Sequence, residues 1–212
     1  SAEQHGCSLI LLGTSMQESG RSGQQVIAGI RAVSALPVVL FPGPGNPVLQ
    51  EADALLFLSL VSGRNPEFLI GQQVQAAPKV RQTGLETIAT AYQLVDGGKT
   101  TTAHYVSQTL PVPADKPGIA AATALAAHYM GMKLHYLDAG SGALNPVPSI
   151  LIQAIKSLNL GPLWVGGGIR SPRQVQEAWQ AGADLVVIGQ ALEENPNHMA
   201  PLFEGLSPQS WR

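Results

Sequence analysis

The sequence predicts an α/β fold of parallel strands alternating with helices, and its glycine turns favour a barrel. Short runs rich in Val, Ile and Leu recur along the 212 residues and are mostly continuous, which is typical of parallel strands covered on both faces. Helical patterns lie between several of these runs, as right-handed βαβ units require. Three later runs end in glycine-bearing turns, where a (β/α)₈ barrel commonly binds phosphate.

Seven runs are predicted to be strands, in the order 8–13, 37–42, 54–60, 85–95, 133–138, 163–168 and 184–189. A complete (β/α)₈ barrel has one strand more. No low-complexity segment or linker interrupts the pattern, so we expect a single domain over residues 1–212.

Helices are predicted over 24–36, 116–132, 148–158 and 172–181. The first has apolar residues at helical spacing, and the other three have proline near their first turn, where proline is tolerated. Ser171 is the expected N-cap of the last. A short helical pattern follows the Ser-Gly-Arg-Asn-Pro stretch at 62–66, whereas 43–53 is too short and too rich in Pro and Gly for an ordinary helix.

The composition excludes several classes of protein. Charged residues make up only 12% of the chain, against the usual ~25%, so we expect subunits or an apolar ligand to cover part of the surface. The net charge of −2 gives no electrostatic reason to expect nucleic acid. Cys7 is the single cysteine, which excludes an intramolecular disulfide and a cysteine-cluster metal site. No apolar run of ~18 residues and no secretory signal is visible, so we expect a cytoplasmic protein.

The three glycine turns predict one phosphate site shared by neighbouring strand ends. Glycine lets backbone N–H groups approach an anion closely, and a helix that starts just beyond adds the positive end of its dipole. The alternative is that glycine only permits three tight turns. Arg170 either helps to neutralise the phosphate or acts as a structural cap partner. The turns read Tyr136-Leu137-Asp138-Ala139-Gly140-Ser141-Gly142, Gly166-Gly167-Gly168 and Gly189-Gln190.

Strand parity places Tyr136 and Asp138 on one face, toward the expected barrel mouth, and His135 on the other face, toward the helices. The five histidines form no His-x-x-x-His or His/Cys cluster for zinc, and no Gly-x-Ser-x-Gly hydrolase motif occurs. The triple glycine lacks the Rossmann spacing.

Along nearly its whole length the chain resembles the geranylgeranylglyceryl phosphate synthase family, the TIM-barrel prenyltransferases that include bacterial heptaprenylglyceryl phosphate synthases. The Ser-Gly-Arg-Asn-Pro and Ile-Gly-Gln segments look like the subgroup that makes geranylgeranyl products. The resemblance is carried by Leu11-Leu12-Gly13-Thr14-Ser15, Pro37–Gly43, Ala52–Leu60, Ser62–Pro66, Ile70-Gly71-Gln72, Asp115-Lys116-Pro117, Tyr136–Gly142, Gly166–Arg170 and Gly182–Gly189.

This resemblance implies a (β/α)₈ TIM barrel whose first strand unit is absent from the sequence as given. It implies an ether-forming phosphoglycerol geranylgeranyltransferase, in which the 3-hydroxyl of sn-glycerol 1-phosphate attacks C1 of geranylgeranyl diphosphate. It also implies Mg²⁺, with Ser15 as one ligand, and a homo-oligomer, either a dimer or a hexamer. By family pattern the glycerol phosphate is held by Tyr136, Leu137, Asp138, Ala139, Gly140, Ser141, Gly142, Gly167, Gly168, Gly189 and Gln190.

The resemblance makes Tyr136 and Asp138 catalytic and gives Tyr92 a place in the prenyl groove. Asp138 stands where the family usually has Glu, which takes the proton from the attacking hydroxyl. Aspartate keeps this chemistry with a reach shorter by one methylene. The family also has a strand that ends in a metal-binding Asp ahead of the Ser15 strand. Nothing in this sequence matches that strand, and we expect it to belong to the complete protein.

Three alternatives stay open. A related prenyltransferase would use another phosphorylated acceptor, such as 3-phosphoglycerate, or another prenyl length. A phosphosugar isomerase or epimerase would use the same phosphate turns without a long apolar groove. A non-catalytic phosphate-binding barrel would need neither Asp138 as a base nor a prenyl donor.

Overall fold

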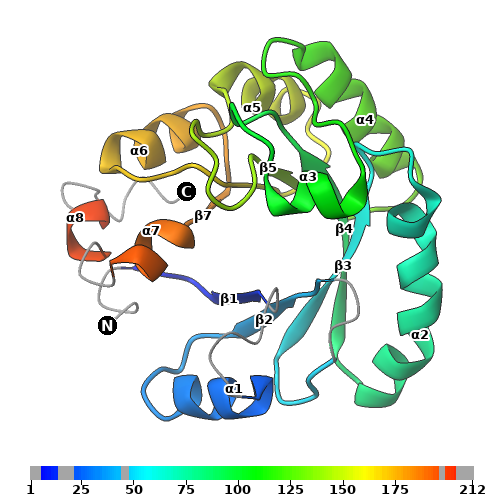
Figure 1. Ribbon diagram of the computed structural model, residues 1–212, viewed down its shortest axis with the longest axis vertical. Coiled ribbons are helices and arrows are strands. Elements are labelled where there is room, and N and C mark those ends of the chain that lie inside the picture. The colour runs from blue at the N-terminus through cyan, green and yellow to red at the C-terminus, as the bar shows by residue number, and fades with distance from the viewer. Residues whose placement is uncertain (1–5, 14–21, 44–47, 196–198, 204–212) are drawn as a thin grey trace.

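Seven parallel strands, paired in chain order, form the wall of a nearly closed TIM barrel in the computed structural model (Figure 1). The structure describes residues 6–13, 22–43, 48–195 and 199–203. Every predicted strand is confirmed, with ends that move by no more than a few residues. The strands are β1 (Ile10–Gly13), β2 (Val38–Phe41), β3 (Ala54–Leu60), β4 (Glu86–Leu94), β5 (Leu134–Asp138), β6 (Leu163–Gly166) and β7 (Leu185–Val187).

The barrel is open along one seam, between β1 and β7. These two strands stand at the ends of the strand order, and no pairing joins them among the described residues. The prediction of a TIM barrel with seven strands is therefore confirmed.

Helices surround the sheet (Figure 1). The predicted helices are present as α1 (Gly23–Arg31), α4 (Pro117–Tyr129), α5 (Ser149–Lys156) and α6 (Pro172–Gln180), and Ser171 caps α6 by accepting a hydrogen bond from the N–H of Gln174. A π-helical segment (Glu67–Gly71) leads into α2 (Gln72–Thr83), which is longer than the sequence predicts and contains Pro78. The sequence did not predict α3 (Thr102–Ser107), α7 (Gln190–Glu194) and α8 (Met199–Phe203).

Helix α1 is shorter than predicted, because the chain turns after Ala32. The N–H groups of Val33 and Ser34 both bond the carbonyl oxygen of Ile30, and the hydroxyl of Ser34 accepts from the N–H of Leu36. These local bonds end the helix before residue 36.

The interior of the barrel is filled by apolar side chains from all seven strands. The register sets Tyr92, Tyr136 and Trp164 level with one another on β4, β5 and β6. Further clusters fill the space between the sheet and the outer helices. One side chain per strand illustrates the inner cluster: Leu11, Val39, Leu56, Tyr92, Tyr136, Trp164 and Val187.

Candidate functional site

Asp138 ends β5 at the mouth of the barrel, and the register places it between Leu94 of β4 and Gly166 of β6. As strand parity predicts, Tyr136 packs inside the barrel, with its ring 5.5 Å from that of Tyr92. His135 faces outward and stacks on His128 of α4, with ring centroids 6.4 Å apart.

Two hydrogen bonds hold the carboxylate of Asp138. The hydroxyl of Tyr92 donates to Oδ2 at 2.6 Å, and the N–H of Gly140 donates to Oδ1 at 2.6 Å. Burial raises the pKa of Asp138, while these two hydrogen bonds and the nearby His104 lower it in part. Burial and the charge of Asp138 raise the pKa values of Tyr92 and Tyr136, so both phenols keep their protons at neutral pH. The site is thus a carboxylate with raised basicity beside two neutral phenols.

Tyr92 was predicted to line a prenyl groove, and that role stays a prediction. The structure places its ring in the barrel interior, edge-on to Phe41 and Tyr136. Its hydroxyl is the hydrogen-bond partner of Asp138. This position favours a role in orienting the carboxylate, which sequence reasoning missed.

The three glycine turns lie together at the mouth. The hydroxyl of Ser141 in the first turn donates to Oε1 of Gln190 after the third, at 3.2 Å. The second turn lies against the first, because a Cβ on Gly167 would lie 2.6 Å from both Oδ1 of Asp138 and the backbone nitrogen of Gly140. Gly167 also has φ +83°, a conformation that favours glycine.

Gly168 belongs to the second turn and Gly189 to the third. Gly168 has φ +71°, and a Cβ there would lie 2.4 Å from the carbonyl oxygen of Asn145, so a side chain has no space. Gly189 directly precedes α7. The predicted phosphate-binding residues are therefore neighbours in space, and phosphate binding itself stays a prediction.

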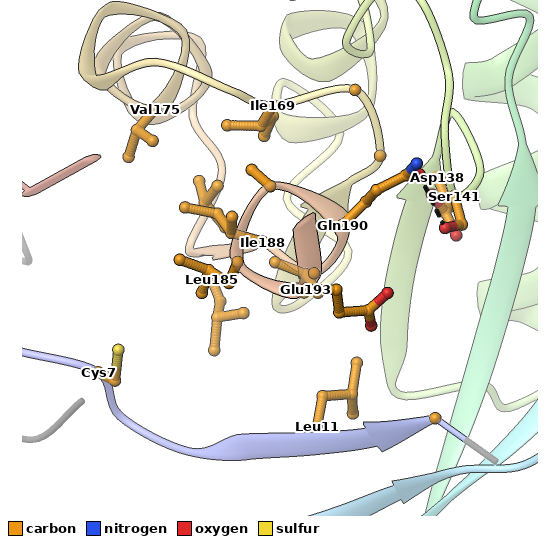
Figure 2. Close-up of a pocket in the computed structure, with 18 of the residues that line it drawn as sticks. Cys7, Leu11, Asp138, Ser141, Ile169, Val175, Leu185, Ile188, Gln190 and Glu193 are labelled. Atoms are coloured by element: carbon orange, nitrogen blue, oxygen red, sulfur yellow. Dashed lines mark hydrogen bonds between the residues drawn. The ribbon is translucent and has the colours of Figure 1, made fainter. Parts of the chain in front are cut away.

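A pocket of about 500 Å³ runs from these turns into the open seam (Figure 2). Figure 2 shows the side chain of Gln190 extended toward Ser141, with Asp138 beside it. The seam side is mainly apolar. It is lined by Leu9 and Leu11 near β1, Leu185, Val187 and Ile188 near β7, and Ile169 and Val175 near α6.

Charged side chains surround the polar end of the pocket. Arg170 is paired with Glu194, with 3.5 Å between Nη1 and Oε2, and its backbone N–H donates to the side chain of Gln174. The side chain of Gln190 also donates to Glu194, at 2.7 Å. The guanidinium of Arg170 is thus paired with a carboxylate, and both predicted roles of Arg170 stay predictions.

Sequence reasoning also missed two groups near the first turn. His104 of α3 is buried, and its Nδ1 accepts a hydrogen bond from the backbone N–H of Thr101 at 3.1 Å. Burial lowers the pKa of His104, against the opposing charge of Asp138. Lys99 extends its ammonium group toward Gly142. No sequence motif includes either residue, because both lie in the segment that follows β4, outside the three glycine turns.

Ser15, the predicted metal ligand, lies outside the described residues. Among the residues that the structure does describe, no group of three or more His, Cys, Asp or Glu side chains could hold a metal ion. Within the same part of the chain, no helix is long and apolar enough to span a bilayer.

Comparison with known proteins places these features in a family. The model of the PcrB family matches residues 2–205. A geranylgeranylglyceryl phosphate synthase of Spirosoma linguale is 49% identical over 179 residues, which cover 84% of this chain and 72% of that protein. The Pyrococcus abyssi protein of the same name is 44% identical over 191 residues, 90% of this chain and 75% of the relative.

A solved structure is similar over almost the whole chain. It is (S)-3-O-geranylgeranylglyceryl phosphate synthase from Thermoplasma acidophilum, in complex with its substrate sn-glycerol-1-phosphate. The TM-score is 0.89 at 35% identity, and the match covers 95% of this chain and 81% of that one.

Proposed function

The chain belongs to the geranylgeranylglyceryl phosphate synthases of the PcrB family, and on that basis we propose that it joins sn-glycerol 1-phosphate to geranylgeranyl diphosphate. The oxygen of the 3-hydroxyl forms an ether bond to C1 of the prenyl chain. The bond between C1 and the diphosphate breaks, and the hydroxyl proton passes to a base. The grouping of the three glycine turns around Asp138 supports this proposal.

Asp138 is the proposed base. An ionised carboxylate has about four lone-pair sites, of which the hydrogen bonds from Tyr92 and Gly140 use two. Burial raises the pKa of Asp138 toward the working pH, which makes the carboxylate a better proton acceptor than an exposed aspartate. The donor from Tyr92 keeps the carboxylate oriented while the other sites stay open to the hydroxyl.

The glycine turns are the proposed phosphate site. Gly167, Gly168 and Ser141 line the same pocket, where backbone N–H groups and a hydroxyl can donate to a phosphate. Gln190 adds a side-chain amide next to Ser141. Fixing the phosphate positions the 3-hydroxyl for attack, which lowers the entropic part of the barrier.

Mg²⁺ dependence is proposed from the family resemblance alone. The described residues do not fit a protein-held Mg²⁺ site, since they contain no group of three or more His, Cys, Asp or Glu side chains that could hold the ion. Turnover should stop when a chelator removes divalent ions and resume when Mg²⁺ is added back.

A homo-oligomer, either a dimer or a hexamer, is also proposed. Large apolar side chains are exposed on neighbouring helices, with Tyr129 79% and Met130 76% exposed at the end of α4. Ile119 of α4 and Ile150 of α5 are each 49% exposed. Together with the low charge fraction, this exposure supports self-association.

The direct test is product formation. The full chain is incubated with geranylgeranyl diphosphate, Mg²⁺ and either enantiomer of glycerol phosphate, and ether products are identified by mass spectrometry. We expect product with sn-glycerol 1-phosphate and little with sn-glycerol 3-phosphate. Failure to form an ether with sn-glycerol 1-phosphate, at any prenyl length, would overturn the proposal.

A further inference from the structure

The turn that follows β4 is fixed directly on the turn that follows β5. The carbonyl oxygen of Gly97 accepts hydrogen bonds from the N–H groups of Leu144 and Asn145, at 2.9 and 3.0 Å. A Cβ on Gly97 would lie 2.6 Å from the Cβ of Ala143, so only glycine permits this approach. The segment after β4 therefore has a defined position beside the glycine turn at 140–142.

This arrangement brings Lys99 to the glycine turn. The N–H of Gly98 donates to Oδ1 of Asp96 at 2.9 Å, and Gly98 has φ +87°. Lys99 comes next in the chain, and its Nζ lies 3.3 Å from the position that a Cβ on Gly142 would occupy. Oε1 of Gln190 lies 2.9 Å from the same position. The ammonium and the amide thus border the same small space, which the glycine leaves open.

The negative charges around the turns would repel a bound phosphate unless a cation lay nearby. A phosphate monoester carries about −1.5 to −2 charges at pH 7, and Asp138, Glu193 and Glu194 are already near the pocket. Arg170 is paired with Glu194, whereas Lys99 makes no ion pair within the part of the chain that the structure describes. Its ammonium is therefore available to a ligand.

We propose that Lys99 binds the phosphate of the acceptor, donating a charge-assisted hydrogen bond across Gly142. This assignment rests on the proposed function, because it adds a group to the same acceptor site. Lysine is a compact cation on a flexible stem, so Nζ can close to the roughly 2.7–2.9 Å typical of such bonds. Lys99 binds the phosphate equally in the ground state and the transition state, because the phosphate does not react.

Calorimetric titration of sn-glycerol 1-phosphate into the full chain tests the assignment. Lys99→Ala should weaken binding about 10-fold or more, since hydrogen bonds to charged groups are the strong ones. It should also reduce the salt dependence of binding, and Lys99→Arg should restore most of the affinity. Lys79→Ala is the matched control. Lys79 is an exposed lysine of α2 beside Thr83, at the amino-terminal end of β4 and away from the mouth.

Steady-state kinetics provide a second readout. Lys99→Ala should raise KM for glycerol phosphate, with kcat and KM for the prenyl diphosphate close to wild type. Wild-type affinity in Lys99→Ala, or a change confined to KM for the prenyl diphosphate, would overturn the assignment and leave the proposed function intact. A wild-type chain that fails to bind sn-glycerol 1-phosphate would overturn the proposed function and this assignment with it.

Discussion

At the scale of single residues, the proposed chemistry centres on Asp138. It is 9% exposed and receives hydrogen bonds from Tyr92 and Gly140. Burial raises its pKa, while the two donors keep the ionised form in one orientation. A carboxylate in this state is a competent proton acceptor near neutral pH.

Asp138→Asn should lower turnover by about 100-fold or more, the usual contribution of a general base. Asparagine keeps an acceptor for Gly140 and cannot take the hydroxyl proton. Affinity for sn-glycerol 1-phosphate should change only a few-fold, and Asp138→Glu should retain more activity than Asp138→Asn because it keeps a carboxylate. Turnover is measured by diphosphate release, and wild-type turnover in Asp138→Asn would remove this residue from the mechanism.

Tyr92→Phe should shift the pH dependence of turnover. The base works deprotonated, so the rate falls as the pH drops through the pKa of Asp138. The hydroxyl of Tyr92 lowers that pKa by stabilising the carboxylate, and its loss should move the acid limb to higher pH. Tyr129→Phe, an exposed tyrosine of α4, is the control and should leave the limb unchanged. An acid limb at the same or lower pH in Tyr92→Phe would contradict the assignment.

At the scale of the elements, the site depends on close contact between turns that follow β5 and β6. Gly167 allows the second turn to lie against Asp138 and Gly140, since any side chain would enter the space that those atoms occupy. Its φ of +83° adds a separate penalty for other residues.

Gly167→Ala should therefore destabilise the fold by about 1–3 kcal/mol, the usual range for backbone strain of this kind, and should displace Asp138. Gly29→Ala is the comparison, because Gly29 lies in the exposed part of α1 with open space around it. Alanine there should stabilise the helix by about 0.5–1 kcal/mol. Chemical denaturation measures the free energy of unfolding of both variants. Equal stability of the two would be evidence against the packing described.

At the scale of the whole molecule, two features of the surface stand out. The barrel is open between β1 and β7, and the large pocket lies in that seam. On α4 and α5, large apolar side chains are exposed to solvent. Exposed apolar surface of this kind is typical of proteins that associate.

If the face on α4 joins subunits, Ile119→Glu combined with Tyr129→Glu should lower the molar mass measured by sedimentation. Buried carboxylates without partners would destabilise the interface. Val33→Glu, which changes an exposed valine just after α1, should leave the mass unchanged. A wild-type chain that sediments as a monomer would refute the proposed oligomer.

Much of this arrangement could be predicted from the sequence. Continuous apolar runs identify the seven strands, and parallel strands bring their carboxyl ends to one edge. That rule alone places the three glycine turns close together. Strand parity likewise predicts that Tyr136 and Asp138 share the inner face while His135 meets a helix.

The parts of the site that the sequence does not predict depend mainly on contacts between distant segments. The bond from Tyr92 to Asp138 joins residues 46 positions apart, and its register is fixed only when β4 pairs with β5. Lys99 reaches the site through hydrogen bonds from Leu144 and Asn145 to Gly97, which no local pattern encodes. Short helices such as α3 and α7 span too few residues to show a periodic pattern.

A crystal structure of the chain with sn-glycerol 1-phosphate would show directly whether the glycine turns bind the acceptor. We expect a phosphate held at Ser141, Gly168 and Gly189, with the 3-hydroxyl within roughly 2.6–3.2 Å of Asp138 or one bridging water away. A phosphate bound elsewhere, or a 3-hydroxyl that points away from Asp138, would contradict this expectation.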